Sequence, residues 1–411
     1  MGNGATKKEK SNKSYLLQTC EEHDGSVNCM EVSEDGSVLA TGSDDAHIRL
    51  WSTKTDLIEC IAVLEGHEDY ITSLLIEDNF LLSSSADKTI RKWDMSTSEC
   101  VLVFLGHEST VNRMVCTGDF VFSVSYDKKA RCRDFDTGEC ERIFSGHKNN
   151  VNSILFIPAD KENLNDALKF VQAHAAKKNL AMKGNRLPPI TKGTQNNRNN
   201  NNNEESDDED NIYSRDLIIT GSLDSTAKSW SIETGECVQT FKSHTAAITC
   251  LATDPLGKLL FTGSADHSIK SWEIMTGQLL KTFAGHQTTV ISLLAHRKLL
   301  YSTSSDHTAR CWVMEFGDCT RIYKEHTHSV STIIENNGLV YTGCGDSQAR
   351  CFDSKSGAIR RTFKGHTGAV NCLRVVEGRL FTGSFDGTLR LWDLNELNAD
   401  RGNGAGEEKS G

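Results

Sequence analysis

Short apolar segments recur along the chain and are separated by polar turns. Segments such as AVNCLRVV (369–376), RLFTGS (379–384) and TLRLWDL (388–394) are rich in β-branched or apolar residues, and Gly and Asp interrupt them. Short strands bounded by turn residues have this pattern. The sequence therefore predicts many short strands joined by tight turns.

These strands belong to a repeat of roughly forty residues. One histidine marks each of eight units, at spacings of 44, 40, 40, 97, 42, 40 and 40 residues. An aspartate follows in each unit, and an aromatic residue stands six positions after it in seven of the eight. The third unit has Arg133 at that position, which we expect either to pair with Asp127 or to point outward. The histidines are His23, His67, His107, His147, His244, His286, His326 and His366; the aspartates are Asp45, Asp87, Asp127, Asp224, Asp266, Asp306, Asp346 and Asp386; the aromatic residues are Trp51, Trp93, Trp230, Trp272, Trp312, Phe352 and Trp392.

A period of this length, punctuated by Gly-His and Trp-Asp pairs, resembles the WD-repeat family of β-propellers, in which each unit supplies one four-stranded blade. The resemblance covers residues 15–395 and implies an all-β, eight-bladed propeller. The last unit ends after its third strand, at LRLWDL. We expect the segment SYLLQT near the N-terminus to supply the missing fourth strand, because an open sheet edge would otherwise remain.

The repeated polar residues predict a buried hydrogen-bond network in each blade. The histidine would contact a Ser or Thr of the second strand and reach the turn aspartate, and the tryptophan would complete the network. An unpaired buried donor costs about 1 to 3 kcal/mol, so each member needs its partners. Metal binding is the alternative for eight histidines. Metal ligands normally cluster at short spacings, whereas these recur once per unit, so we expect no metal and no cofactor.

The spacing of 97 residues arises from an insertion at 158–213, between the first and second strands of the fourth unit. Its first half places Leu164, Leu168, Val171 and Ala175 on one helical stripe, which predicts a short amphipathic helix. Its second half is polar and of low complexity, so we expect it to be disordered. We expect the same of the tails at 1–14 and 396–411.

Charge and composition restrict the class of partner and the cellular compartment that we expect for this protein. The net charge is −11, and six of the negative charges come from the run EESDDED, which argues against nucleic acid as the main partner. The sequence contains neither an apolar run of about 18 residues nor a secretory leader, so we expect a cytoplasmic protein, monomeric apart from its partners. The 14 cysteines are then expected to be free thiols that act as small core residues.

Catalytic motifs such as GxSxG, HExxH or a P-loop are absent from the sequence. The leading hypothesis is therefore a non-catalytic scaffold whose blade loops bind other proteins or peptides. A substrate receptor of a ubiquitin ligase and a Gβ-like signalling partner are the alternatives. Against them, the sequence lacks the arginine that follows Trp-Asp in a linker-binding box, and residues 1–14 are too short for a coiled-coil helix.

Four large side chains occupy loop positions that are small or polar in most units. They stand just before the turn aspartate or three residues after the repeat histidine, and they are Tyr70, Tyr126, Leu223 and Phe385. Exposed large side chains on a rim built from loops are candidate partner-binding residues. Isolated apolar residues on an ordinary surface are the alternative interpretation.

The first residues, MGNGATKKEK, match a lipidation signal. Gly2 with Thr6 fits the N-myristoylation pattern, and Lys7, Lys8, Lys10 and Lys13 would supply the second, electrostatic signal that one acyl chain needs at an anionic membrane surface. The sequence therefore predicts a peripheral membrane protein. The alternative is a Gly-rich leader without modification, since RGNGAGEEKSG near the other end is similar in composition.

Overall fold

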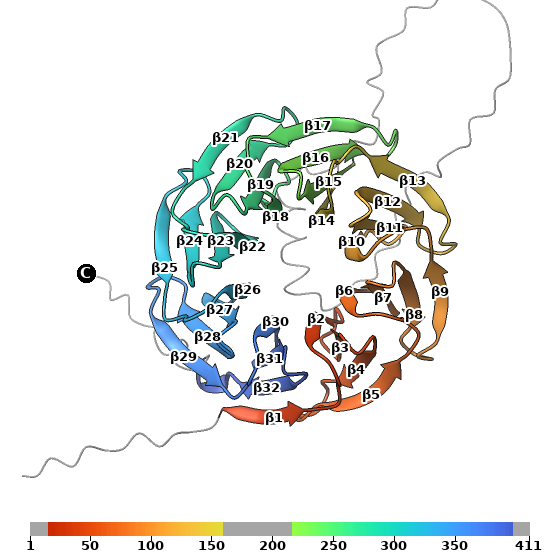
Figure 1. The fold of residues 1–411 in the computed structure, drawn as a ribbon. Helices are drawn as coiled ribbons and strands as arrows, with labels where there is room; N and C mark the ends of the chain where they lie inside the picture. The colour runs from red at the N-terminus through yellow and green to blue at the C-terminus, as the bar shows by residue number, and fades with distance from the viewer. Residues whose placement is uncertain (1–14, 159–215, 398–411) are drawn as a thin grey trace, which may run out of the picture.

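A computed structural model describes residues 15–158 and 216–397. Gly2, the expected helix of the insertion and most of the expected disordered segments lie outside these residues. The expected disorder of the tail at 396–411 is wrong for residues 396 and 397, which belong to a helical turn in which Leu397 is buried. The described chain forms 32 strands in eight four-stranded sheets, which are arranged like blades around a central axis (Figure 1). The predicted all-β, eight-bladed propeller is confirmed.

Within each blade the strands run from the centre outward as a, b, c and d. Blades 1 to 4 comprise β2 (Val27–Val32), β3 (Val38–Ser43), β4 (Ile48–Ser52) and β5 (Glu59–Leu64); β6 (Ile71–Glu77), β7 (Phe80–Ser85), β8 (Ile90–Asp94) and β9 (Cys100–Phe104); β10 (Val111–Cys116), β11 (Phe120–Ser125), β12 (Lys129–Asp134) and β13 (Cys140–Ser145); β14 (Val151–Ile157), β15 (Leu217–Ser222), β16 (Thr226–Ser231) and β17 (Cys237–Lys242). Blades 5 to 8 comprise β18 (Ile248–Thr253), β19 (Leu259–Ser264), β20 (Ile269–Glu273) and β21 (Leu279–Phe283); β22 (Val290–His296), β23 (Leu299–Ser304), β24 (Ala309–Val313) and β25 (Cys319–Tyr323); β26 (Val330–Asn336), β27 (Leu339–Cys344), β28 (Gln348–Asp353) and β29 (Ile359–Lys364); β30 (Val370–Val376), β31 (Arg379–Ser384), β32 (Leu389–Asp393) and β1 (Leu16–Cys20).

The N-terminal strand closes the ring, as predicted. β1 pairs antiparallel with β32 and becomes the outer strand of blade 8, so the first and last strands share one sheet (Figure 1). After β32 the described chain ends in a single helical turn at 395–397, and the Leu397 side chain packs against the core of blades 7 and 8. Among the described residues, no helix is long and apolar enough to cross a membrane.

The hydrophobic core lies between neighbouring blades. Trp93 of blade 2, for example, packs in one cluster with Ile48 and Leu50 of blade 1. The b strands are buried almost throughout, because both of their faces contact an adjacent sheet, whereas side chains of the d strands alternate between half-buried and exposed. Each blade therefore depends on its neighbours for burial, as in other repeat architectures.

All 14 cysteines are free thiols, as predicted. The expectation that they are all core residues is wrong for Cys140, Cys237 and Cys319, which are exposed. Each of these three begins an outer d strand, and no further strand among the described residues covers that edge of the sheet.

Candidate functional site

Each turn aspartate holds two loops together on one rim of the propeller. In blade 1, Asp45 Oδ1 accepts the His47 N–H at 2.8 Å and shapes the b–c turn, while Asp45 Oδ2 accepts the Asp24 N–H from the loop before strand a at 3.1 Å. The equivalent pair of bonds occurs in all eight blades. We call the surface formed by these b–c turns and d–a loops the histidine rim.

A chain of hydrogen bonds supports this rim from inside each blade. In blade 5 the Trp272 Nε1–H donates to Thr262 Oγ1 at 2.9 Å, Thr262 Oγ1 lies 2.8 Å from His244 Nε2, and His244 Nδ1 lies 2.7 Å from Asp266 Oδ2. A carboxylate can only accept, so the ring proton is on Nδ1 and the threonine hydroxyl donates to Nε2. Blades 1, 2, 4, 6 and 8 place the predicted residues in the same arrangement.

The electrostatics of the network favour a neutral histidine beside an ionised aspartate. Burial lowers the pKa of His147, His244 and His366 below 6.5, although each faces a carboxylate. Burial by itself would raise the pKa of Asp45, but the hydrogen bond and charge of His23 and the backbone amides lower it to about 2. The pKa of the Asp266 carboxyl is likewise lowered to about 2, and Ser268 is the strongest of its hydrogen-bond donors.

Blade 3 replaces tryptophan by a buried arginine, and the expectation for Arg133 is wrong. The side chain is 1% exposed, and it neither points outward nor forms an ion pair with Asp127. Its Nη1 donates to Ser123 Oγ at 3.2 Å and its Nη2 to the Leu105 carbonyl at 2.8 Å. The guanidinium thus supplies the donor that a tryptophan Nε1–H supplies elsewhere, because the serine oxygen still needs one.

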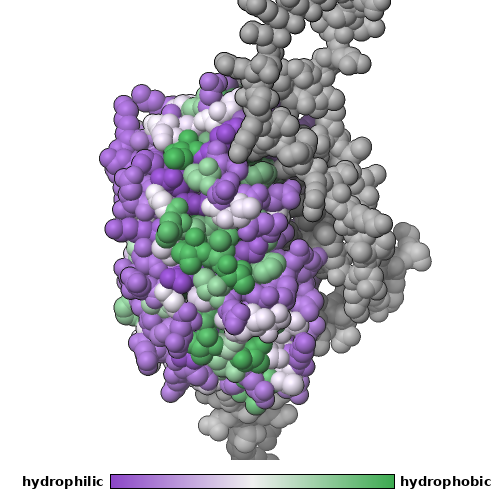
Figure 2. Space-filling model, turned by 90° about the vertical axis from the view of Figure 1, so that its right-hand side faces the viewer, coloured by the Kyte–Doolittle hydropathy of each residue, from purple (hydrophilic) through white to green (hydrophobic). Residues whose placement is uncertain are grey.

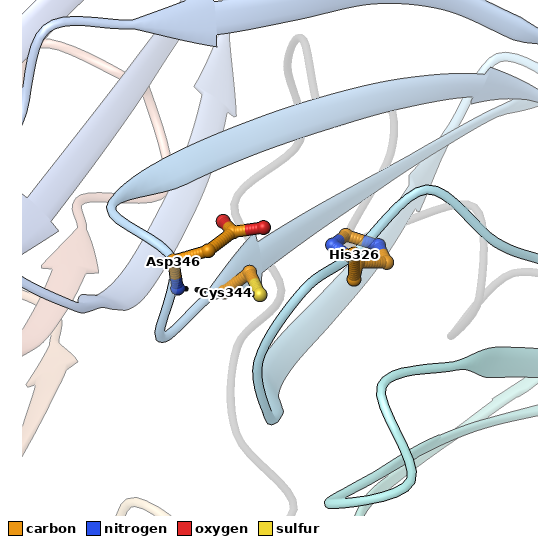
Figure 3. Close-up of side chains that lie close together, drawn as sticks. All are labelled: His326, Cys344 and Asp346. Carbon is orange, nitrogen blue, oxygen red and sulfur yellow. Dashed lines mark hydrogen bonds between the residues drawn. The ribbon is translucent and has the colours of Figure 1, made fainter.

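Blade 7 brings together His326, Cys344 and Asp346, which offer nitrogen, sulfur and oxygen atoms within 4.8 Å of one another (Figure 3). Such a set can hold a metal ion in principle. Here the Arg350 guanidinium lies between the histidine and the aspartate, with Nη1 2.9 Å from His326 Nδ1 and Nη2 2.8 Å from Asp346 Oδ2. A fixed cation already contacts two of the three groups, His326 and Asp346, so the geometry favours a hydrogen-bond network over a metal centre.

Blade 7 differs from blade 6 at two further positions near Arg350. In blade 6, the side chain of Arg310 packs against Gly285, where an added Cβ would lie 2.6 Å from Arg310 Nη1. Blade 7 has Glu325 at that position, with φ +80°, and Arg350 turns instead toward the aspartate. Phe352 replaces the tryptophan donor, so Thr342 Oγ1 can accept from Nε2 while Nδ1 accepts from Arg350. The ring proton has therefore moved to Nε2.

Among the described contacts, blade 7 therefore lacks the direct histidine–aspartate bond that the sequence predicts for every unit. The contacts of Arg350 that replace this bond were not predicted. Burial and the Arg350 charge lower the pKa of His326 to about 3. Of the two sequence changes, Phe in place of Trp is the one confined to blade 7, because Glu also precedes the histidine in blade 1, where the direct His23–Asp45 bond is kept.

The histidine rim exposes three of the four predicted partner-binding residues. Tyr70 is 38% exposed, Tyr126 37% and Phe385 66%. Leu223 is half-buried. The three aromatic residues belong to blades 2, 3 and 8, which lie on one half of the ring (Figure 1). The positions equivalent to Phe385 in blades 5, 6 and 7 are Ala265, Ser305 and Gly345.

Comparisons with known proteins agree with this geometry. The family described as WD domain, G-beta repeat matches more than half of the chain, at residues 14–52, 58–94, 98–134, 235–273, 277–313 and 357–393. Human WD repeat-containing protein 86 is 45% identical over 62 residues, which cover 15% of this chain and 16% of that protein. Mitochondrial division protein 1 of Saccharomyces cerevisiae is 33% identical over 90 residues, or 18% of this chain and 13% of that protein. The crystal structure of the computationally designed Ika8 protein matches 92% of this chain and 99% of its own, with a TM-score of 0.72 and 23% identity, and supports the fold alone.

Proposed function

Since the chain belongs to the WD domain, G-beta repeat family, whose propellers are generally protein-interaction scaffolds, we propose that it is a non-catalytic scaffold whose histidine rim binds a segment of another protein. The observation that carries this proposal is the exposure of Phe385, 66%, on a loop fixed by the network beneath it. A large apolar side chain on a rigid, solvent-facing turn adds nothing to the core. It suits a partner-binding residue, because aromatic residues dominate the energetics of protein interfaces.

The charge around the aromatic residues defines the partner. Asp24, Asp44, Glu68, Asp69 and Glu108 are all exposed on the histidine rim of blades 1 to 3. Exposed cations on the same loops are fewer, namely Lys88 and Lys128. Complementary charge raises the association rate and excludes like-charged partners. The preferred partner segment therefore carries an apolar side chain beside basic residues.

We predict that a Tyr126→Ala, Phe385→Ala double variant loses partners that the parent protein retains. The two side chains would contribute on the order of 2 kcal/mol each if they are central to the interface. Affinity purification from cells, quantified against the parent, measures the loss. A Leu279→Ala, Leu280→Ala variant is the matched control, because it removes two exposed apolar side chains from β21, away from the rim. If the aromatic double variant retained every partner, the rim would have no role in binding.

We further propose that the scaffold is a cytoplasmic protein held at membranes by N-myristoylation of Gly2. The strand topology indicates which rim of the propeller such a tether would hold near the membrane. β1 runs antiparallel to β32, with Cys20 opposite Leu389 near the histidine rim and Leu16 opposite Trp392 toward the other rim. Residue 15 therefore lies on the rim opposite the repeat histidines. An acyl chain on the preceding segment would hold that rim near the bilayer and leave Tyr70 and Tyr126 facing the cytoplasm.

We predict that the protein incorporates an alkyne-labelled myristate in cells and that Gly2→Ala abolishes both the label and membrane association. A single myristoyl chain binds membranes only marginally, and each nearby lysine adds about 1 kcal/mol at an anionic surface. The control is Gly4→Ala, which alters the same leader but leaves the acceptor glycine intact. A parent protein without label, or a Gly2→Ala form that stays on membranes, would refute the tether while leaving the rim proposal untouched.

A further inference from the structure

The outer strands of blades 1 and 2 form an open apolar sheet edge. β5 and β9 are the last strands of their sheets and, among the described residues, pair only with their inner neighbours β4 and β8. Exposed side chains alternate along both strands: Ile61 is 53% exposed, Val63 38%, Val101 49% and Val103 36%. Figure 2 views the propeller from the side at the right of Figure 1, where β9 lies, and apolar patches interrupt its hydrophilic surface. Apolar side chains thus project beside backbone groups that no strand of the described chain covers.

Most outer strands of the propeller carry a cationic side chain, but β1, β5 and β9 carry none. Five outer strands carry Lys or Arg, with Arg142 on β13, Lys242 on β17, Lys281 on β21, Arg321 on β25 and Arg360, Arg361 and Lys364 on β29. Cationic side chains on an edge strand discourage another strand from adding to the sheet. β9, with the sequence CVLVF, has no charged residue at all. This edge therefore lacks the usual protection against strand addition.

Acidic residues flank the same edge. Glu59 and Glu65 stand at the two ends of β5, and Glu99 precedes β9; all three are exposed. Arg49 and Arg91, on the inner neighbours β4 and β8, are half-buried, and the Arg91 guanidinium lies 6.0 Å from the centre of the Trp93 ring. The charge presented to solvent beside the edge is consequently negative.

We propose that β9, with β5 beside it, is a second interaction site that accepts an extended segment of a partner protein as an additional strand. Backbone hydrogen bonds to β9 would hold the segment, and alternate apolar side chains would pack on Val101 and Val103. Basic residues at both ends of the segment would face Glu59, Glu65 and Glu99. A second copy of this chain fits less well, because two-fold pairing of β9 with β9 would bring the same acidic flanks together.

The test uses the full chain and a fluorescent synthetic peptide that alternates valine and threonine between pairs of lysines. We expect saturable binding by fluorescence anisotropy, and we expect a Val101→Lys, Val103→Lys variant to bind at least about tenfold more weakly. A Val101→Thr, Val103→Thr variant keeps the strand propensity and should also bind more weakly. It tests the proposal even if the lysine variant does not fold. The matched control is Ile322→Lys on β25, an exposed apolar residue beside Arg321, which should bind as the parent does.

Two modified peptides separate the elements of the proposal. A peptide methylated on alternate backbone nitrogens cannot pair with a strand and should not bind, and a peptide with glutamates in place of the lysines should bind weakly or not at all. Equal binding by the methylated peptide, or by both valine variants, would overturn the proposal. Sedimentation of the parent as a dimer that Val101→Lys, Val103→Lys converts to a monomer would also overturn it and assign the edge to a second copy.

Discussion

Replacing Trp272 by alanine is expected to lower the free energy of unfolding by about 3 to 5 kcal/mol, a large part of the stability of an ordinary domain. The indole is 2% exposed and packs edge-on against Phe241, with ring centres 5.7 Å apart. Alanine would leave a cavity between blades 4 and 5 and remove the donor to Thr262 Oγ1. Urea unfolding followed by circular dichroism at neutral pH measures the loss.

Trp272→Phe separates packing from hydrogen bonding at this position. Phenylalanine keeps most of the buried surface and removes only the Nε1–H, so we expect a loss of about 1 kcal/mol. Phe352 in blade 7 shows that the position accepts this side chain, with the change of histidine tautomer described above. Equal losses for the alanine and phenylalanine variants would mean that the hydrogen bond, and not the packing, dominates.

Acid is expected to destabilise the protein in two stages. The pKa values of His107, His147, His244, His326 and His366 are lowered in the folded state, chiefly by burial, so an unfolded chain binds protons more readily below about pH 6.5. Their contribution to stability is present above that pH and is lost as the pH falls toward their folded values. Each titrating histidine costs about 1.4 kcal/mol per pH unit within that interval.

The aspartates continue the loss at lower pH. Four turn aspartates have a pKa of about 2 in the folded protein, against 3.8 for an unperturbed carboxyl; they are Asp45, Asp127, Asp224 and Asp266. Their contribution to the free energy of unfolding is therefore present above about pH 3.8 and disappears as the pH falls toward 2. Urea midpoints measured from pH 7 to pH 3 should therefore fall continuously. An Asp266→Asn variant, which removes one titrating carboxylate, should be less stable at pH 7 but lose less on acidification. A free energy of unfolding that stays constant from pH 7 to pH 4 would contradict the buried, neutral state of the histidines.

Most of the fold could be read from the sequence, because a repeat imposes the same local rules eight times. The Gly-His and Trp-Asp positions set the blade boundaries, and the incomplete eighth unit pointed to the N-terminal strand as its closing partner. Members of one blade's network are about ten to twenty residues apart in most units, close enough for the pattern to reveal them. Each blade must satisfy the same buried donors and acceptors, so residue type and position were enough.

The exceptions needed the tertiary structure. Arg133 and Arg350 are both basic residues of c strands, yet one replaces an indole donor and the other separates a histidine from its aspartate. The two stand at different positions of the repeat, Arg133 at the tryptophan position and Arg350 two residues before it. Arg310 of blade 6 shares the position of Arg350 but packs against Gly285, so the partners of each guanidinium follow from the side chains around it, which the repeat pattern does not encode. The exposure of surface side chains also depended in part on the tertiary structure. The sequence identified Tyr126 and Phe385 as large residues at loop positions, but the exposure of Val101 and Val103 follows from β9 being the outermost strand of its sheet. Alternation along a strand shows that two faces differ, whereas only the assembled propeller decides which strands remain uncovered.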